Sequence, residues 1–185
     1  MSRLPEAPDW HHLRSVVGTA EFVPDAVTRM VHAANVEDAS SAYWELDNRV
    51  VVQGQLFEAA ACTARAVAIA ICQGEASAMG LTRALDLLVE ISAGEADHSE
   101  LALGNAALGD VCRAELRQYL PCFRSLVTND DEQTLLHLLD LLDLLELDRE
   151  GLRELAEVFL AGRSGTALAE RARTITAGID DTSGW

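Results

Sequence analysis

Apolar residues recur along this chain with the spacing of an α-helix almost from end to end. The clearest run lies between residues 135 and 147, where every position is leucine except His137, Asp140, Asp143 and Glu146. A helix on the surface of a protein normally keeps a broad polar face, so most of the circumference of this one must be covered by other helices. The sequence therefore predicts an all-α fold with closely packed helices.

Glycine, proline and short polar turns divide the pattern into eight or nine helices. Residues 92–109 interrupt it with scattered glycines and acidic residues, and we expect a loop insertion there. Pro121 should bend its helix, because its ring disturbs the bond to the carbonyl of Arg117. Residues 179–185 are expected to form a frayed tail. The helices are predicted at residues 10–17, 24–34, 39–51, a stretch ending near 72, 77–91, 110–127, 132–147, 149–161 and a stretch ending at 178.

Units of helix, tight turn and helix repeat about every 40 residues once the insertion at 92–109 is set aside. One such unit cannot bury its apolar face alone, so it needs a stacked neighbour. We therefore expect a single domain, residues 1–178, that forms a short right-handed α–α superhelix of about four helical hairpins.

Two stretches of the chain resemble a known family. Residues 119–127, with Pro121, are followed by the acidic turn 129–132 and the leucine-rich helix, and this order resembles a HEAT repeat. The N-terminal part, with Asp9-Trp10, Val23-Pro24 and Gln53-Gly54, is similar to uncharacterised HEAT-like proteins of actinobacteria. The resemblance implies an armadillo-like α-solenoid, a bacterial source and a role in protein binding.

The charge balance narrows the choice of partners. The chain has 14 basic and 30 acidic residues, which gives a formal net charge of −16, and every basic residue is arginine. Nucleic acids are normally bound by a patch of Lys and Arg, so the composition argues against nucleic acid as the direct partner. The longest nearly apolar stretch, residues 59–72, is broken by Arg65 and is too short for a bilayer. We expect a cytoplasmic protein that does not bind membranes.

The four cysteines offer no metal-binding signature. Cys62, Cys72, Cys112 and Cys122 show no CxxC pairing. Because the chain shows no export signal, they are expected to be four reduced thiols that act as small core residues. We predict no metal site and no cofactor.

Two carboxylate pairs lie on single helical faces, since Asp86 and Glu90 are four residues apart and Asp140 and Asp143 three. No nucleophile, phosphate loop or metal-ligand trio accompanies either pair, which favours a solvated stripe over acid–base catalysis. His137 lies three residues before Asp140, whose carboxylate could hold the ring in one tautomer.

The second helices of a HEAT-like solenoid line its inner curve, so acidic residues on them should gather in one concave groove. Such a groove would attract a basic protein in a salt-dependent way. The alternative is that the acidic residues are spread evenly and only keep the protein soluble. One member of the pair Tyr43 and Trp44 is expected to pack in the core. The predicted groove residues are Glu45, Asp47, Asp86, Glu90, His137, Asp140 and Asp143.

Together these features favour a non-enzymatic protein-binding module. One version is an immunity protein that covers a basic toxin, another is a regulatory scaffold, and a second copy of the chain would also fit the surface. The rival hypothesis is an enzyme or small-molecule binder with a pocket between helices near His137 and Asp140. A continuous acidic groove would favour the first hypothesis, and a deep pocket converging on these residues the second.

Overall fold

The computed structural model describes residues 8–146, 148–160 and 165–182. Within these ranges the chain forms ten α-helices and one sheet of three very short strands, so the all-α prediction is confirmed. The helices are α1 (Val23–Val31), α2 (Val36–Val50), α3 (Ala60–Cys72), α4 (Ala78–Ala93), α5 (His98–Ala102), α6 (Leu108–Arg117), α7 (Leu120–Ser125), α8 (Glu132–Leu145), α9 (Arg149–Leu160) and α10 (Ala167–Thr182). A single 3₁₀ turn, Leu126–Thr128, follows α7.

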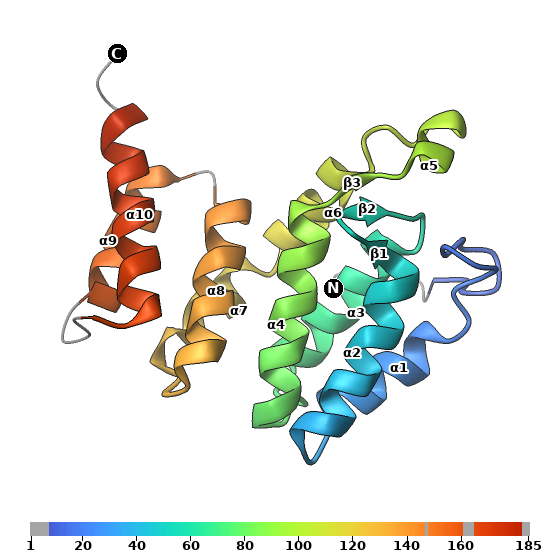
Figure 1. Cartoon of the computed structure of the whole chain (residues 1–185), viewed down its shortest axis with the longest axis horizontal. Helices are drawn as coiled ribbons and strands as arrows, with labels where there is room; N and C mark the ends of the chain where they lie inside the picture. Colours follow the sequence, from blue (N-terminus) through green and yellow to red (C-terminus); the bar gives the residue numbers. More distant parts are fainter. Residues whose placement is uncertain (1–7, 147, 161–164, 183–185) are drawn as a thin grey trace, which may run out of the picture.

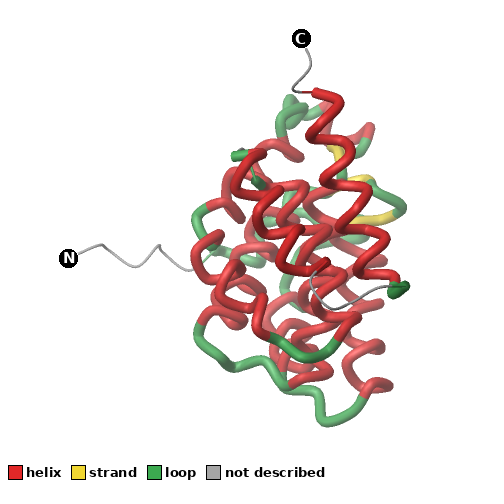
Figure 2. Tube along the Cα trace, turned by 90° about the vertical axis from the view of Figure 1, so that its left-hand side faces the viewer, coloured by secondary structure: helices red, strands yellow, loops and turns green. Residues whose placement is uncertain are grey.

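The helices follow one another in pairs along the long axis of the molecule, from α1 and α2 at one end to α9 and α10 at the other (Figure 1). The second helices form one row, in which α2 packs on α4, α4 on α8, and α8 on α10. The first helices form another, in which α1 packs on α3 and α3 on α6. Viewed from the end that carries α10, the pairs overlap in one stack (Figure 2). HEAT membership and a right-handed superhelix remain predictions.

The second helices begin at capping residues that the sequence supplies in the turns before them. Asn35 Oδ1 accepts a hydrogen bond from the backbone N–H of Asp38 at 2.9 Å, and Ser77 Oγ accepts one from Gly80 at 3.0 Å. Asp131 Oδ2 accepts the N–H of Thr134 at 2.7 Å. These caps satisfy amide groups that would otherwise lack partners, and they fix where α2, α4 and α8 start.

The leucine-rich helix α8 is covered on most sides, as its sequence predicts. It packs against α4, α6, α7 and α10. Its leucines at 135, 138, 139, 141, 142 and 145 are no more than 1% exposed. The last predicted position of this helix, residue 147, lies outside the described residues.

Residues 10–17 do not form the predicted helix. They make turns that bring Arg14 into an isolated β-bridge with Thr19. Gly18 has a φ of +74°, and its carbonyl accepts the N–H of Ser15, while the N–H of Val16 bonds to the carbonyl of Arg49 at the end of α2. A helix this short is marginal by itself, so these tertiary hydrogen bonds determine the local conformation.

The segment 92–109 is more structured than the predicted loop insertion. The turn at Gln53 and Gly54, both with positive φ, joins β1 (Val51–Val52) to β2 (Gln55–Leu56) as an antiparallel hairpin. From the segment, β3 (Glu95–Ala96) pairs in parallel with β2, and α5 follows directly. Glu100 of α5 is 1% exposed and binds Arg14 of the N-terminal segment. An ion pair between distant segments has no local sequence pattern, and for that reason the sequence did not predict it.

The single helix predicted at 110–127 is two helices, α6 and α7. The helix stops at Arg117 and a new one begins at Leu120, with Pro121 in its first turn. A proline needs no backbone hydrogen bond in a first turn. The chain therefore breaks before the proline and does not bend at it.

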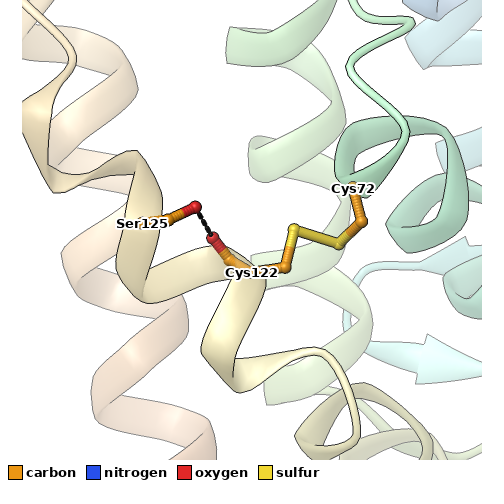
Figure 3. Close-up of a disulfide and its surroundings, with 3 residues drawn as sticks. All are labelled: Cys72, Cys122 and Ser125. Atoms are coloured by element: carbon orange, nitrogen blue, oxygen red, sulfur yellow. Dashed lines mark hydrogen bonds between the residues drawn. A yellow bond between two sulfur atoms is a disulfide. The ribbon is translucent and has the colours of Figure 1, made fainter.

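The prediction of four reduced thiols is wrong for two of them. Cys72, at the end of α3, and Cys122, in α7, form a disulfide with a Cα–Cα distance of 5.8 Å (Figure 3). Cys62 and Cys112 are free. The paired cysteines are 50 residues apart in the sequence. Only the tertiary fold brings α3 and α7 together, and the spacing of the two cysteines in the sequence gives no sign of it.

The last helix extends beyond the predicted boundary at residue 178. α10 continues to Thr182, and Ile179 is 3% exposed. Residues 179–182 are therefore helical and not part of a frayed tail, and the remaining residues of the predicted tail, 183–185, lie outside the described part of the chain.

Gly80 allows α4 to approach α1 closely. A Cβ atom on Gly80 would lie 2.6 Å from the carbonyl oxygen of Met30 and closer still to that of Val31. Both atoms belong to the backbone, so the helices would have to separate.

We expect Gly80→Ala to lower the free energy of unfolding by about 3 kcal/mol, measured by urea unfolding. Gly178→Ala in α10 is the control, because its added Cβ would meet no atom of the described residues within 4 Å beyond its own stretch of helix, and alanine favours a helix by up to about 1 kcal/mol. Equal free energies of unfolding for Gly80→Ala and Gly178→Ala would contradict the close contact between α4 and α1.

Candidate functional site

Three carboxylates from neighbouring second helices lie close together. Asp47 comes from α2, and Asp86 and Glu90 come from consecutive turns of α4. Burial, followed by the charges of Glu90 and Asp86, raises the pKa of Asp47 to about 6. We call Tyr43, Asp47, Asp86 and Glu90 the α2–α4 cluster. It contains three of the seven residues that the sequence analysis assigned to the groove.

Tyr43 of α2 is buried and feels the charges of these carboxylates. It is only 5% exposed, and its hydroxyl has no hydrogen-bond partner among the described residues. Burial raises the pKa of the Tyr43 hydroxyl, and the charges of Asp86, Asp47 and Glu90 raise it further. The hydroxyl therefore lies within electrostatic range of all three carboxylates.

Within the described residues, one carboxylate of the cluster is paired with arginine, and the other two are not. Arg83 Nη1 donates to Asp86 Oδ2 at 2.9 Å, and its guanidinium carbon lies 5.4 Å from the centre of the Tyr43 ring. On the other side, His137 Nδ1 of α8 lies 3.7 Å from Asp86 Oδ1. Asp47 and Glu90 form no ion pair within the described part of the chain. The cluster therefore keeps uncompensated negative charge at these two residues.

Glu45 does not join the cluster, which corrects the groove prediction for this residue. Its carboxylate forms an ion pair with Arg29 of α1 and lies 3.7 Å from Arg49 Nη1. The side chain therefore serves the contact between α1 and α2, and its charge is largely compensated.

Asp140 and Asp143 are also used within the fold. Arg171 of α10 binds both carboxylates, with Nη2 at 2.9 Å from Asp143 Oδ2, and Arg149 contacts Asp143 at 3.1 Å. The carboxylate near His137 is that of Asp86, not the expected Asp140. Gln133 holds the other ring nitrogen of His137 at 2.8 Å.

A pocket of about 400 Å³ opens where α2, α4 and α8 begin. Val36 and Met79 give it apolar walls, and Thr82, Arg83, Gln133 and His137 provide polar groups. Asp140 is not among its lining residues, so the predicted pocket near His137 exists without that carboxylate. Arg83 and His137 connect the pocket to the cluster through their shared contact with Asp86.

The sequence pattern predicted no site role for Tyr43, Trp44 or Arg83. As expected, one aromatic residue of the pair is in the core, while Trp44 is 53% exposed and meets the Tyr43 ring edge to face at 5.0 Å. The spacing of Arg83 and Asp86, three residues apart on one helix, was the available signal for their ion pair. No comparable signal connects residues of α2 with residues of α4.

No protein-family model, curated protein or solved structure matches this chain. None of the helices in the described ranges is long and apolar enough to cross a membrane. Among the same residues, no group of three or more His, Cys, Asp or Glu side chains is arranged to hold a metal ion. The candidate site is therefore interpreted from its own geometry.

Proposed function

We propose that the protein is a non-enzymatic, HEAT-like binding module of the bacterial cytoplasm that holds a basic protein on the face formed by its second helices. The observation that carries this proposal is the uncompensated charge of Asp47 and Glu90 beside Asp86. Arginine elsewhere in the described chain is largely consumed by internal pairs, as in Arg14 with Glu100 and Arg65 with Glu115. A net charge of −16 adds an attractive field for a basic partner.

Two versions of this function fit the same surface. An immunity protein would cover a basic toxin, and a regulatory scaffold would hold a basic cellular protein. A second copy of the chain is disfavoured as the partner at the cluster, because it would bring like charges together.

The test is capture of a partner by the immobilised protein from the cells that make it, at about 50 mM and about 500 mM salt. The captured protein is then purified for affinity measurements. Reversing both uncompensated charges, in Asp47→Lys with Glu90→Lys, should weaken binding at low salt by about tenfold or more. High salt should weaken binding to the unmodified protein as well.

The matched control is Glu37→Lys with Glu75→Lys. It makes the same change in net charge at exposed positions in and before the same helices, away from the cluster. If both double variants lose affinity equally, the acidic residues act only as a diffuse field. If neither loses affinity, the second-helix face is not the binding surface.

A second candidate function rests on the pocket where α2, α4 and α8 begin. Its volume is within the range of small-molecule sites, and it combines apolar walls with hydrogen-bond donors. A small-molecule binder or enzyme would be sensitive to His137→Ala and Thr82→Val and insensitive to the reversal at Asp47 and Glu90. The two candidate functions therefore predict opposite responses to these variants.

A further inference from the structure

The side chain of Tyr43 is only 5% exposed, and its hydroxyl has no hydrogen-bond partner within the described residues. A polar group of this kind normally bonds to protein or to water. Among the described residues, Ser92 Oγ is the only side-chain nitrogen or oxygen atom that is fully enclosed and has no hydrogen-bond partner. The Tyr43 oxygen is therefore still reachable from outside the protein. A ligand atom that approaches between α2 and α4 could complete its hydrogen bonding.

The groups around this hydroxyl define what such a ligand must carry. Asp47 and Glu90 form no ion pair within the described residues, and Asp86 beside them is paired with Arg83. The pKa of Asp47 is raised to about 6 by burial and by Glu90 and Asp86. All of these groups favour a positively charged hydrogen-bond donor.

Arg83 already shows how a guanidinium fits this environment. It donates to the Asp86 carboxylate at 2.9 Å and to Ser40 Oγ at 3.2 Å, and it lies over the Tyr43 ring at 5.4 Å. A planar guanidinium can hydrogen-bond a carboxylate and contact an aromatic face at the same time. The unused carboxylates Asp47 and Glu90 belong to the same cluster.

Trp44 supplies a second aromatic wall at the surface. Its side chain is 53% exposed, although its ring contacts Tyr43. Trp44 and Asp47 are three residues apart on α2 and so lie on the same side of the helix. Trp is the best aromatic partner in cation–π interactions, and Arg is the cation in them more often than Lys.

We propose that an arginine side chain of the partner occupies the α2–α4 cluster, with its guanidinium donating to Asp47, Glu90 and the Tyr43 hydroxyl and packing against Trp44. This inference rests on the proposed function and names the chemical group that the surface recognises. Arginine fits better than lysine, because its five donors are fixed in one plane and it is more weakly hydrated than an ammonium group.

The inference is tested with three capped pentapeptides that differ at one position, Gly-Gly-X-Gly-Gly, where X is arginine, lysine or citrulline. Citrulline has the shape of arginine without its charge. NMR titration should show saturable shifts in the amide signals of Asp47 and Glu90 with the arginine peptide. The lysine peptide should bind about tenfold more weakly, and the citrulline peptide should cause no shifts.

Single neutral variants locate the site. Asp47→Asn and Glu90→Gln should each weaken binding of the arginine peptide by about fivefold or more. Glu37→Gln on the exposed first turn of α2 should leave it unchanged. Asp47→Asn is also expected to fold at neutral pH at least as stably as the original protein, because a raised pKa in the folded state means that ionised Asp47 opposes folding above about pH 6. Its loss of binding therefore cannot be attributed to unfolding.

Binding should also weaken as the pH falls through about 6, because protonated Asp47 no longer attracts a cation. The charges that act on Asp47 are those of Glu90 and Asp86 from α4. Tyr43 of the same helix feels Asp47 and Arg83 as well, and His137 of α8 contacts Asp86. A histidine can gain charge in the same pH range. The pH dependence should therefore persist in His137→Gln and disappear in Asp47→Asn.

The outcomes separate this inference from the proposed function. Equal binding of the arginine and lysine peptides, with equal loss in Glu37→Gln, would overturn the arginine site and leave an acidic docking surface in place. The arginine site would also be overturned if the arginine peptide failed to bind while Asp47→Lys with Glu90→Lys still abolished binding of the partner. The acidic docking surface would remain in that case. A captured partner that ignores the double reversal would overturn both.

Discussion

Replacing Cys72 and Cys122 together by serine is expected to lower the free energy of unfolding by about 4 kcal/mol. The disulfide closes a loop between residues 50 apart in the sequence, and it restricts the unfolded chain far more than the folded one. In the folded protein it links the C-terminal end of α3 to α7 (Figure 3). The loss should appear as a lower urea midpoint with a larger m-value, because the unfolded chain becomes more expanded.

Reduction with dithiothreitol provides the matching experiment. It should destabilise the original protein to a similar extent and have no effect on the double serine variant. Cys62→Ser is the control, because Cys62 is free and only partly buried. If unfolding of the original protein does not respond to the reductant, the bridge does not contribute to stability as expected.

The second large effect is expected at Glu100, where Glu100→Ala should cost about 3 kcal/mol of unfolding free energy. The side chain is 1% exposed and accepts hydrogen bonds from Arg14 Nη2 at 2.8 Å, from Asn105 Nδ2 at 2.6 Å and from the backbone N–H of Glu58 at 3.3 Å. Alanine would leave these donors without their acceptor. Because Arg14 is partly exposed and also contacts Glu58 at 3.0 Å, the cost should stay near the lower end of the range for buried ion pairs.

The effect at Glu100 should depend on pH. Burial by itself raises the pKa of Glu100, but the bonds from Arg14, Asn105 and Glu58 outweigh burial and leave the pKa below its ordinary value of 4.5. A lowered pKa in the folded state gives stability that is present above the unfolded pKa and is lost as the pH falls through the folded value. The difference between Glu100→Ala and the original protein should therefore shrink below pH 4.5.

The control for this experiment is Glu95→Ala, which removes a mostly exposed carboxylate from the same segment. Glu95 pairs with Arg113 at the surface, so its loss should cost less than about 1 kcal/mol at neutral pH. Urea unfolding of both variants at neutral and acidic pH provides the comparison. Equal costs for Glu95 and Glu100 at neutral pH would show that the buried pair does not anchor the segment.

The sequence predicted most of the helices because their signals are local. Polar caps such as Asn35, Ser77 and Asp131 stand directly before the apolar pattern, and the density of leucine in α8 required cover on most sides. The missed features depend on residues far apart in the chain. The bond between Arg14 and Glu100 and the disulfide between Cys72 and Cys122 are of this kind. No periodicity within one segment can indicate such a pair.

The candidate site was predictable to the extent that position on a helix determines it. Asp47, Asp86 and Glu90 were assigned to one surface, and the structure brings these three together. Glu45, Asp140 and Asp143 were assigned to the same groove, but Arg29 and Arg171 bind them within the fold. The packing of the helices determines which carboxylates an arginine side chain can contact. It therefore also determines which carboxylates remain without an arginine partner.

The bridge between Cys72 and Cys122 also determines how tension would pass through the molecule. A pull on the two ends of the chain would be carried by the sulfur atoms, and residues 73–121 between them would bear no load. About a quarter of the contour length would thus stay slack during forced extension. That sheltered stretch includes the whole of α4, so the helix that carries Asp86 and Glu90 would not be stretched along its backbone.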